Sequence, residues 1–276
     1  MTLAPHLDRL SALLEGVAPR IEVRQPPVAT QTLAHEASSE QFLNLYLLTE
    51  GQVGFSMGPS YLGIVKGPAV IVCRADVAHL LETDSASGFC GLLCAKAVLD
   101  GPVGALLFSE FAAPHVITLE GADDSLSHVV QLIASELHSP RCGQPALLSR
   151  AGDILFIGLL RHLIAHPGRS GGLFSGLADP RIARALVAMH ARPQNAWTLE
   201  TLSDEAGMSR TAFANVFREV MCQTPGKYLS KLRLAIAREA VKSGLGLKRA
   251  AKESGYLSSS ALSRALARSK LSVNIE

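Results

Sequence analysis

The sequence predicts an α+β fold, with an N-terminal β-barrel flanked by helices and an all-α domain after it. Short apolar runs separated by glycine and proline fill residues 41–120, as is typical of β-sandwiches and barrels. Apolar residues at helical spacing dominate beyond residue 124. The charge divides too: residues 179–276 carry 16 Lys and Arg against 8 Asp and Glu, whereas residues 1–178 carry 10 against 16. These shifts predict two domains, 1–170 and 179–276, the second a basic nucleic-acid module.

Residues 3–14 are expected to form a short amphipathic helix, and Pro26-Pro27 then breaks regular structure. Strands are predicted from Gln41 to near Glu120. Two helices should follow. Asp123-Asp124-Ser125 offers an N-cap for residues 126–137, and residues 144–166 form a longer helix that is apolar on most sides. Such a helix is buried either in its own core or against a second copy of the chain, and both alternatives stay open.

The basic half begins after a Gly-rich stretch, residues 167–172, that is typical of a linker. Asp179-Pro180 places an N-cap residue and a first-turn proline at the start of a helix. Residues 197–226 then predict two short helices joined at Gly207, with Leu199, Leu202 and Ala206 on one face of the first. Ser209 caps the second helix, which carries Phe213, Val216 and Phe217 on one face. This is a helix-turn-helix pattern.

The layout repeats after a helix predicted over residues 227–243 and closed by Gly244. Residues 247–254, Gly255 and residues 259–268 form the second unit. A linking helix of roughly 18 residues separates the units by about 27 Å of rise. That length is close to one turn of DNA, about 34 Å, so one chain places two helices in successive major grooves.

This tandem layout resembles the AraC/XylS family of transcription regulators over residues 179–268. The matching segments are Ile182–Leu186, Trp197–Leu202, Gly207–Phe213, Phe217-Arg218, Pro225, Tyr228-Leu229, Leu232–Leu234, Ala237-Arg238 and Gly255-Tyr256. The acidic half is similar to the cupin-type sensor domain of some members, through Val65–Gly67, Ala78–Leu80, Cys90-Gly91 and Leu159–Arg161. The resemblance implies a sequence-specific activator or repressor that binds double-stranded DNA, acts through RNA polymerase and forms a homodimer.

By the same resemblance, exposed positions of the second helix in each unit would contact DNA. In the first unit these are Ser209, Arg210, Thr211, Ala214, Asn215 and Arg218; in the second they are Ser259, Ser260, Ser263, Arg264 and Arg268. Arg210 suits guanine or a phosphate, Asn215 suits adenine, and Arg264 is the best base-reading candidate of the second unit. Arg218, Arg268, Lys248 and Lys227 suit phosphates, which fix register without reading sequence.

The second unit departs from the family pattern in two respects. Leu262 and Leu266 stand where phenylalanine is usual, and no Gly-x-x-Pro-x-x-Tyr-Arg-like segment follows the last helix. We therefore expect a second unit that is less stable or reads bases less well. Arg264→Ala should then weaken operator binding less than Arg210→Ala and Asn215→Ala together.

Three cysteines and one histidine are candidates for the sensor site: Cys73, His79, Cys90 and Cys94. Thiols with imidazole suit zinc, for which His79, Cys90 and Cys94 are the candidate ligands. The same thiols suit a redox switch, or they serve only as small buried hydrophobic residues. A small ligand inside the barrel is the fourth alternative.

Several function classes are disfavoured by composition. The N-terminus lacks the apolar run of a signal peptide, and the run 154–160 is too short for a membrane span. Five cysteines do not indicate a secreted disulfide framework, so a reducing cytoplasm is expected. A cupin-fold enzyme with a helical appendage is the alternative to a regulator. His79 has no second histidine two residues on, so the histidine cluster of metal-dependent cupin enzymes is missing and no catalytic residue is predicted.

Overall fold

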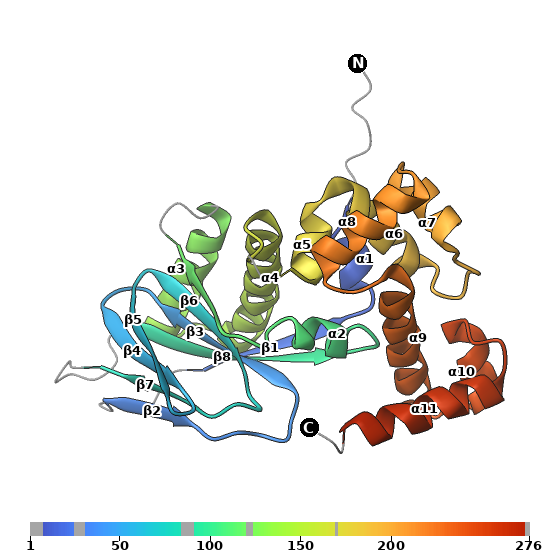
Figure 1. Ribbon diagram of the computed structural model, residues 1–276. Helices are drawn as coiled ribbons and strands as arrows, with labels where there is room; N and C mark the ends of the chain where they lie inside the picture. The colour runs from blue at the N-terminus through green and yellow to red at the C-terminus, as the bar shows by residue number, and fades with distance from the viewer. Residues whose placement is uncertain (1–7, 25–30, 84–90, 120–123, 169–170, 274–276) are drawn as a thin grey trace. The chain divides into compact units, whose positions relative to one another are not determined.

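The computed structural model describes residues 8–24, 31–83, 91–119, 124–168 and 171–273. These residues form two compact units. One comprises Pro19–Leu99 and Phe108–His162, and the other comprises Met1–Ala18, Asp100–Leu107 and Leu163–Glu276. Figure 1 shows strands together with helices in the first unit and helices in the second. No helix in the described part of the chain combines the length and apolar character needed to span a membrane.

Among the described residues of the first unit, nine strands form two antiparallel sheets. The five-stranded sheet has the order β1-β8-β3-β6-β9 and the four-stranded sheet the order β2-β7-β4-β5. The strand bounds are β1 Ala18–Arg24, β2 Thr32–His35, β3 Phe42–Leu48, β4 Gln52–Met57, β5 Ser60–Lys66, β6 Ala69–Arg74, β7 His79–Glu82, β8 Leu92–Asp100 and β9 His115–Thr118. The β-rich, cupin-like prediction is thereby confirmed. The expectation that strands begin at Gln41 was wrong, because β1 and β2 precede it.

The core between the sheets draws side chains from both of them. Tyr46, Leu48, Ala69, Ile71, Cys73 and Leu92 come from the larger sheet, and Val53, Phe55, Val65 and Leu81 come from the smaller one. Side chains alternate along a strand, so Leu43, Leu45 and Leu47 of β3 lie on the opposite face of the larger sheet. All three are fully buried. Helices α3 (Asp124–His138) and α4 (Gln144–Ala165) lie beside this sheet (Figure 1).

Helix α4 confirms the predicted long helix and explains Gly152. A side chain at Gly152 would meet Ile21 of β1 at 2.7 Å, so this glycine permits close packing of helix on strand. Leu155, Phe156 and Leu159 are buried, whereas Ile154 is exposed, so the helix buries one face. Between β8 and β9 lies α2, Gly104–Ser109. The N-cap expected at residues 123–125 lies partly outside the described residues.

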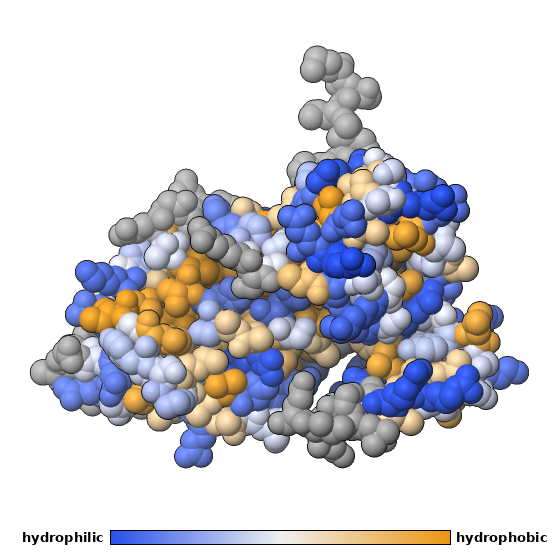
Figure 2. Space-filling model, viewed as in Figure 1, coloured by the Kyte–Doolittle hydropathy of each residue, from blue (hydrophilic) through white to orange (hydrophobic). Residues whose placement is uncertain are grey.

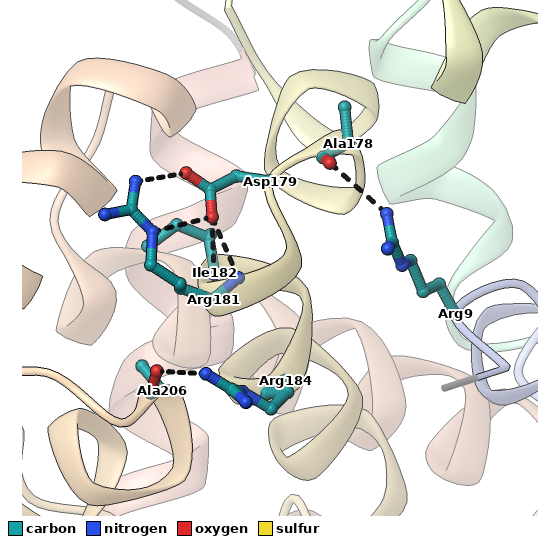
Figure 3. Close-up of polar contacts among 7 residues, drawn as sticks. All are labelled: Arg9, Ala178, Asp179, Arg181, Ile182, Arg184 and Ala206. Atoms are coloured by element: carbon teal, nitrogen blue, oxygen red, sulfur yellow. Dashed lines mark hydrogen bonds and ion pairs between the residues drawn. The ribbon is translucent and has the colours of Figure 1, made fainter. Parts of the chain in front are cut away.

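The second unit is helical. Its elements are α1 Ser11–Leu14, α5 Leu173–Ala178, α6 Pro180–Ala191, α7 Leu199–Ala206, α8 Arg210–Met221, α9 Pro225–Lys242, α10 Leu247–Ser254 and α11 Ser259–Val273. Helix α1 is shorter than the predicted 3–14 helix, of which residues 3–7 lie outside the described residues. Asp179 caps α6 as expected, accepting hydrogen bonds from the backbone N–H groups of Arg181 and Ile182 (Figure 3). The side chain of Arg181 donates to the same carboxylate and holds its pKa below the ordinary value.

Candidate nucleic-acid interface and sensor cluster

The first helix-turn-helix unit is α7 and α8, joined at Gly207. Gly207 has φ +64°, the left-handed conformation that favours glycine. Ser209 Oγ then accepts a hydrogen bond from the N–H of Ala212 and caps α8. Phe213 and Phe217 are fully buried. Of the three residues predicted on one face of α7, Leu202 and Ala206 are buried and Leu199 is exposed.

The predicted reading face of α8 is open to solvent. The six residues expected at the DNA are Ser209, Arg210, Thr211, Asn215 and Arg218, all exposed, and Ala214, which is half-buried. Because Phe213 and Phe217 anchor the opposite face of the helix, these side chains all lie on the side available to a ligand. A helix presented in this way suits the major groove of B-DNA.

Two arginines of the helical unit, outside α7 and α8, bind backbone carbonyl groups. Arg184 donates to the carbonyl oxygen of Ala206 at 2.7 Å, which satisfies the C-terminal end of α7 (Figure 3). Arg9 reaches the carbonyls of Leu177 and Ala178 at the end of α5 in the same way. These two guanidinium groups hold helices together, so part of the basic charge in this unit is structural.

The second helix-turn-helix unit is α10 and α11, joined at Gly255 with φ +79°. Ser258 Oγ accepts a hydrogen bond from the N–H of Ala261, so Ser258 is the serine that caps α11. The predicted contact residues are Ser259, which is half-buried, and Ser260, Ser263, Arg264 and Arg268, which are exposed.

The two leucines that replace phenylalanine pack the core of the second unit. Leu262 is fully buried against Ala237, Ala250 and Ala251, and Leu266 packs on the same cluster. The buried neighbours of Leu262 are alanines, whose side chains are small. The two leucines therefore fill the space between α9, α10 and α11. Arg233 of α9 adds hydrogen bonds to the carbonyls of Pro193 and Asn195. The second unit is therefore a packed unit in this structure.

The helix between the units has the predicted length. Helix α9 contains 18 residues, which corresponds to about 27 Å of rise. Thr224 caps it by accepting a hydrogen bond from the N–H of Lys227. Lys227 and Lys248, the further phosphate candidates, are both exposed.

The cupin-like unit, Pro19–Leu99 and Phe108–His162, contains a cluster of polar side chains between its two sheets. Tyr46 lies opposite Cys94 on β8, and its neighbour two residues back, Asn44, lies opposite Cys73 on β6. Residues two apart share a face of a strand, so Tyr46, Cys73 and Cys94 all face the smaller sheet. His79 of β7 meets them there. Its Nε2 lies 2.7 Å from the Tyr46 hydroxyl and 3.5 Å from Cys73 Sγ.

The tautomer of His79 follows from its other nitrogen. Nδ1 lies 2.8 Å from the carbonyl oxygen of Val77. A carbonyl only accepts, so Nδ1 carries the hydrogen and Nε2 of the neutral ring accepts from Tyr46 or Cys73. Burial lowers the pKa of His79 and keeps the ring neutral. Sequence reasoning missed Tyr46, because the contact joins residues 33 apart.

The thiols of this cluster are protonated at rest. Burial raises the pKa of Cys73 and of Cys94 to about 12, so each thiol becomes a nucleophile only where a neighbouring base removes its proton. Strand β3 separates β6 from β8, and the partners of Cys73 and Cys94 on β3 are two residues apart. Two strand spacings and two residues of rise place the two cysteines about 12 Å apart. A disulfide needs Cα atoms within roughly 7 Å, so these two thiols cannot join in this fold.

The predicted zinc ligands are not assembled by the described residues. Within ranges 31–83 and 91–119 His79 and Cys94 are placed, whereas Cys90 lies outside the described residues. No group of three or more His, Cys, Asp or Glu side chains in the described part of the chain is arranged to hold a metal ion.

Comparison with known proteins agrees with both halves. A cupin family model matches residues 8–165 and a helix-turn-helix domain model matches residues 202–270. The chain is 28% identical to the RCS-specific HTH-type transcriptional activator RclR of Escherichia coli, over 95% of this chain and 94% of RclR. It is 31% identical to the HTH-type transcriptional regulator AlkR of Acinetobacter baylyi, over 71% of this chain but 64% of AlkR.

Among solved structures, ToxT of Vibrio cholerae aligns with a TM-score of 0.37 at 9% identity, over 91% of this chain and 93% of ToxT. The cupin match covers more than half of the chain, and the relatives are named as HTH-type transcriptional regulators. The chain belongs to the AraC/XylS family of transcriptional regulators and carries an N-terminal cupin domain.

Proposed function

We propose that the protein is a sequence-specific DNA-binding regulator, without catalytic activity, that reads two successive major grooves through α8 and α11. The observation that carries this proposal is the pair of serine-capped helices, each anchored by buried apolar residues and exposed on its polar face. In this arrangement Arg210, Asn215 and Arg264 make the base contacts.

Salt-dependent binding tests the proposal. The full chain should shift promoter fragments nearest its own gene, and footprinting should reveal two protected segments about one helical turn apart. Affinity should fall steeply with salt concentration, because each neutralised phosphate releases counterions. Binding with equal affinity for all DNA sequences, or a footprint with a single protected segment, contradicts the proposal that α8 and α11 bind two successive major grooves. No binding under any condition favours the enzyme alternative.

For the signal, we propose a two-electron oxidant that acts on Cys73. Support comes from the relative named RCS-specific, which aligns along almost the whole chain, and from the Tyr46–His79–Cys73 contacts. His79 Nε2 is the base within 3.5 Å of the thiol. His79 takes the thiol proton, and the sulfur then attacks the oxygen of hypochlorous acid or peroxide to form the S–O bond of a sulfenic acid. Hypochlorous acid loses chloride in this step, whereas peroxide loses hydroxide, which receives the proton from His79 and leaves as water. A polar sulfenic acid in this core would disturb the Tyr46–His79 hydrogen bond and the packing around it.

The matching experiment measures DNA binding before and after a peroxide or hypochlorite pulse. Cys73→Ser should abolish the response, whereas Cys142→Ser and Cys222→Ser, which change exposed cysteines, should retain it. A response that persists in Cys73→Ser contradicts the assignment. Metal analysis of the same preparations tests the competing proposal of zinc at His79, Cys90 and Cys94, for which one equivalent of zinc lost in Cys94→Ser is the expected result.

We also propose that two copies of the chain associate through β5, as a homodimer that contacts RNA polymerase to regulate transcription. Strand β5 is an outer strand of its sheet, so one row of its backbone groups is available for pairing. Tyr61, Leu62 and Ile64 of this strand are more than half exposed, and Figure 2 shows hydrophobic side chains gathered over β4 and β5. Antiparallel pairing of β5 with its own copy buries the same surface on both chains, as a two-fold axis requires.

A further inference from the structure

The turn of the second helix-turn-helix unit is one residue longer than that of the first. In the first unit, Met208 alone separates the left-handed Gly207 from the cap Ser209. In the second, Tyr256 and Leu257 separate Gly255 from the cap Ser258. Met208 and Tyr256 are both half-buried, so they are equivalent and Leu257 is the additional residue.

Leu257 has no side-chain cover. It is 103% exposed, more than any other large hydrophobic residue in the described part of the chain. A fully exposed leucine gains nothing from its own fold, since its apolar surface stays in water. Substitution by a polar residue would therefore cost the folded chain little, and the stability of the unit does not explain the leucine.

The position of Leu257 is beside the predicted DNA. It precedes Ser258, the cap of α11, by one residue, and the N-terminal residues of such a helix face base edges in the major groove. The surroundings are basic as well. Burial raises the pKa of the neighbouring Tyr256, and the charges of Arg233, Arg268 and Arg238 act against that rise. An exposed apolar side chain at the N-terminal end of α11 matches one apolar feature of the major groove, the 5-methyl group of thymine.

We infer that Leu257 is a specificity-determining residue of the second unit, which packs on the 5-methyl group of a thymine in the segment bound by α11. This inference rests on the proposed two-groove binding. It assigns an apolar contact to a helix whose other predicted contacts, Ser259, Ser260, Ser263 and Arg264, are polar. The contact is made in the DNA complex, where burial of both the leucine and the methyl group removes apolar surface from water.

The test replaces thymine by deoxyuridine, which lacks only the methyl group. Footprinting of the full chain first identifies the segment bound by the second unit, and each thymine there is then replaced in turn. At one position the wild-type protein should lose roughly three- to tenfold in affinity. Leu257→Ala should lose a similar factor on the unmodified operator and then show no further loss at that one position. Leu247→Ala, which alters an exposed leucine at the start of α10, should behave as the wild type.

The other outcomes separate the two proposals. If the wild type fails to bind any promoter fragment, the proposed function and this inference both fall. If the wild type binds in two segments but Leu257→Ala binds equally well, or keeps the full sensitivity to deoxyuridine, only the inference falls. Leu257→Ala that binds normally but loses transcription in a purified system with RNA polymerase would assign the residue to a protein contact instead, which also overturns the thymine contact.

Discussion

Ser209 and Ser258 occupy equivalent positions in the two helix-turn-helix units. Ser209 Oγ accepts the N–H of Ala212 at 3.3 Å, and Ser258 Oγ accepts the N–H of Ala261 at 3.1 Å. Each serine therefore fixes where its reading helix begins. Counting from these caps places Arg264 at the position that Asn215 holds in the first unit, six residues beyond the serine in both.

This equivalence predicts separate base contacts for Asn215 and Arg264. Asn215→Ala and Arg264→Ala should each lose about 1–3 kcal/mol of discrimination at one base pair of its own segment. Mobility-shift titration on operators altered at single base pairs measures this loss. Arg150→Ala, an exposed arginine of α4, serves as the control and should leave affinity unchanged.

The relative losses of DNA affinity also test whether the second helix-turn-helix unit, which departs from the family pattern at Leu262 and Leu266, reads bases less well than the first. We expect Arg264→Ala to weaken binding less than Arg210→Ala and Asn215→Ala combined. An equal loss would contradict the expectation of a second unit that reads bases less well, and would agree with the packed core that Leu262 and Leu266 form.

Lys227 is predicted to contact a phosphate rather than a base. It lies exposed in the first turn of α9, between the two units. Lys227→Ala should weaken binding to all sequences alike and reduce the slope of log affinity against log salt by about 0.9. Titration at several salt concentrations, on operator and on unrelated DNA, measures both effects. A loss confined to one operator base pair would contradict the phosphate assignment.

The helical unit was largely predictable, because its signals are local. Gly207, Ser209 and the spacing of Phe213 and Phe217 all act within one turn or two of helix. The roles of its arginines were not predictable in the same way. Arg184 and Arg233 add to the basic charge in the sequence, yet the structure uses them to bind carbonyl oxygens at Ala206 and Pro193.

The polar cluster of the cupin domain shows the opposite case. Cys73 and His79 were identified from residue type alone, but Tyr46 became part of the site only through the pairing of β3 with β6 and β8. Such pairings join residues distant in sequence and depend on strand register. Strands β1 and β2 were missed for a different reason: both lie before the glycine-punctuated region from which the strands were predicted.

His190 should make the helical unit sensitive to acid. Its Nε2 lies 2.6 Å from the Tyr228 hydroxyl, and burial lowers the pKa of the ring to about 4 from 6.5. The unfolded chain therefore binds the proton first as pH falls. The contribution of neutral His190 to the free energy of unfolding is therefore fully present above pH 6.5 and is lost as the pH falls from 6.5 to 4. The loss in unfolding free energy reaches at most about 3 kcal/mol.

His190→Gln should flatten this dependence, because a glutamine amide can keep a hydrogen bond to Tyr228 without titrating. Urea unfolding at pH 7.0 and 4.5 measures the difference in unfolding free energy. His128→Gln, a substitution at an exposed histidine of α3, should retain the wild-type pH dependence. A His190→Gln variant as acid-sensitive as the wild type would assign the loss to other groups.

The β5 edge makes a prediction about oligomeric state. Ile64→Lys places a charge in the exposed apolar surface of this outer strand, and a buried unpaired charge at a two-fold contact occurs twice. The wild-type protein should elute as a dimer in light-scattering chromatography, and Ile64→Lys should elute as a monomer with unchanged circular dichroism.

Val116→Lys is the matched control, because Val116 is also an exposed branched residue on an outer strand, β9 of the other sheet. It should remain a dimer. If Val116→Lys dissociates the protein and Ile64→Lys does not, the contact lies on the larger sheet, and a monomeric wild type would exclude the homodimer altogether.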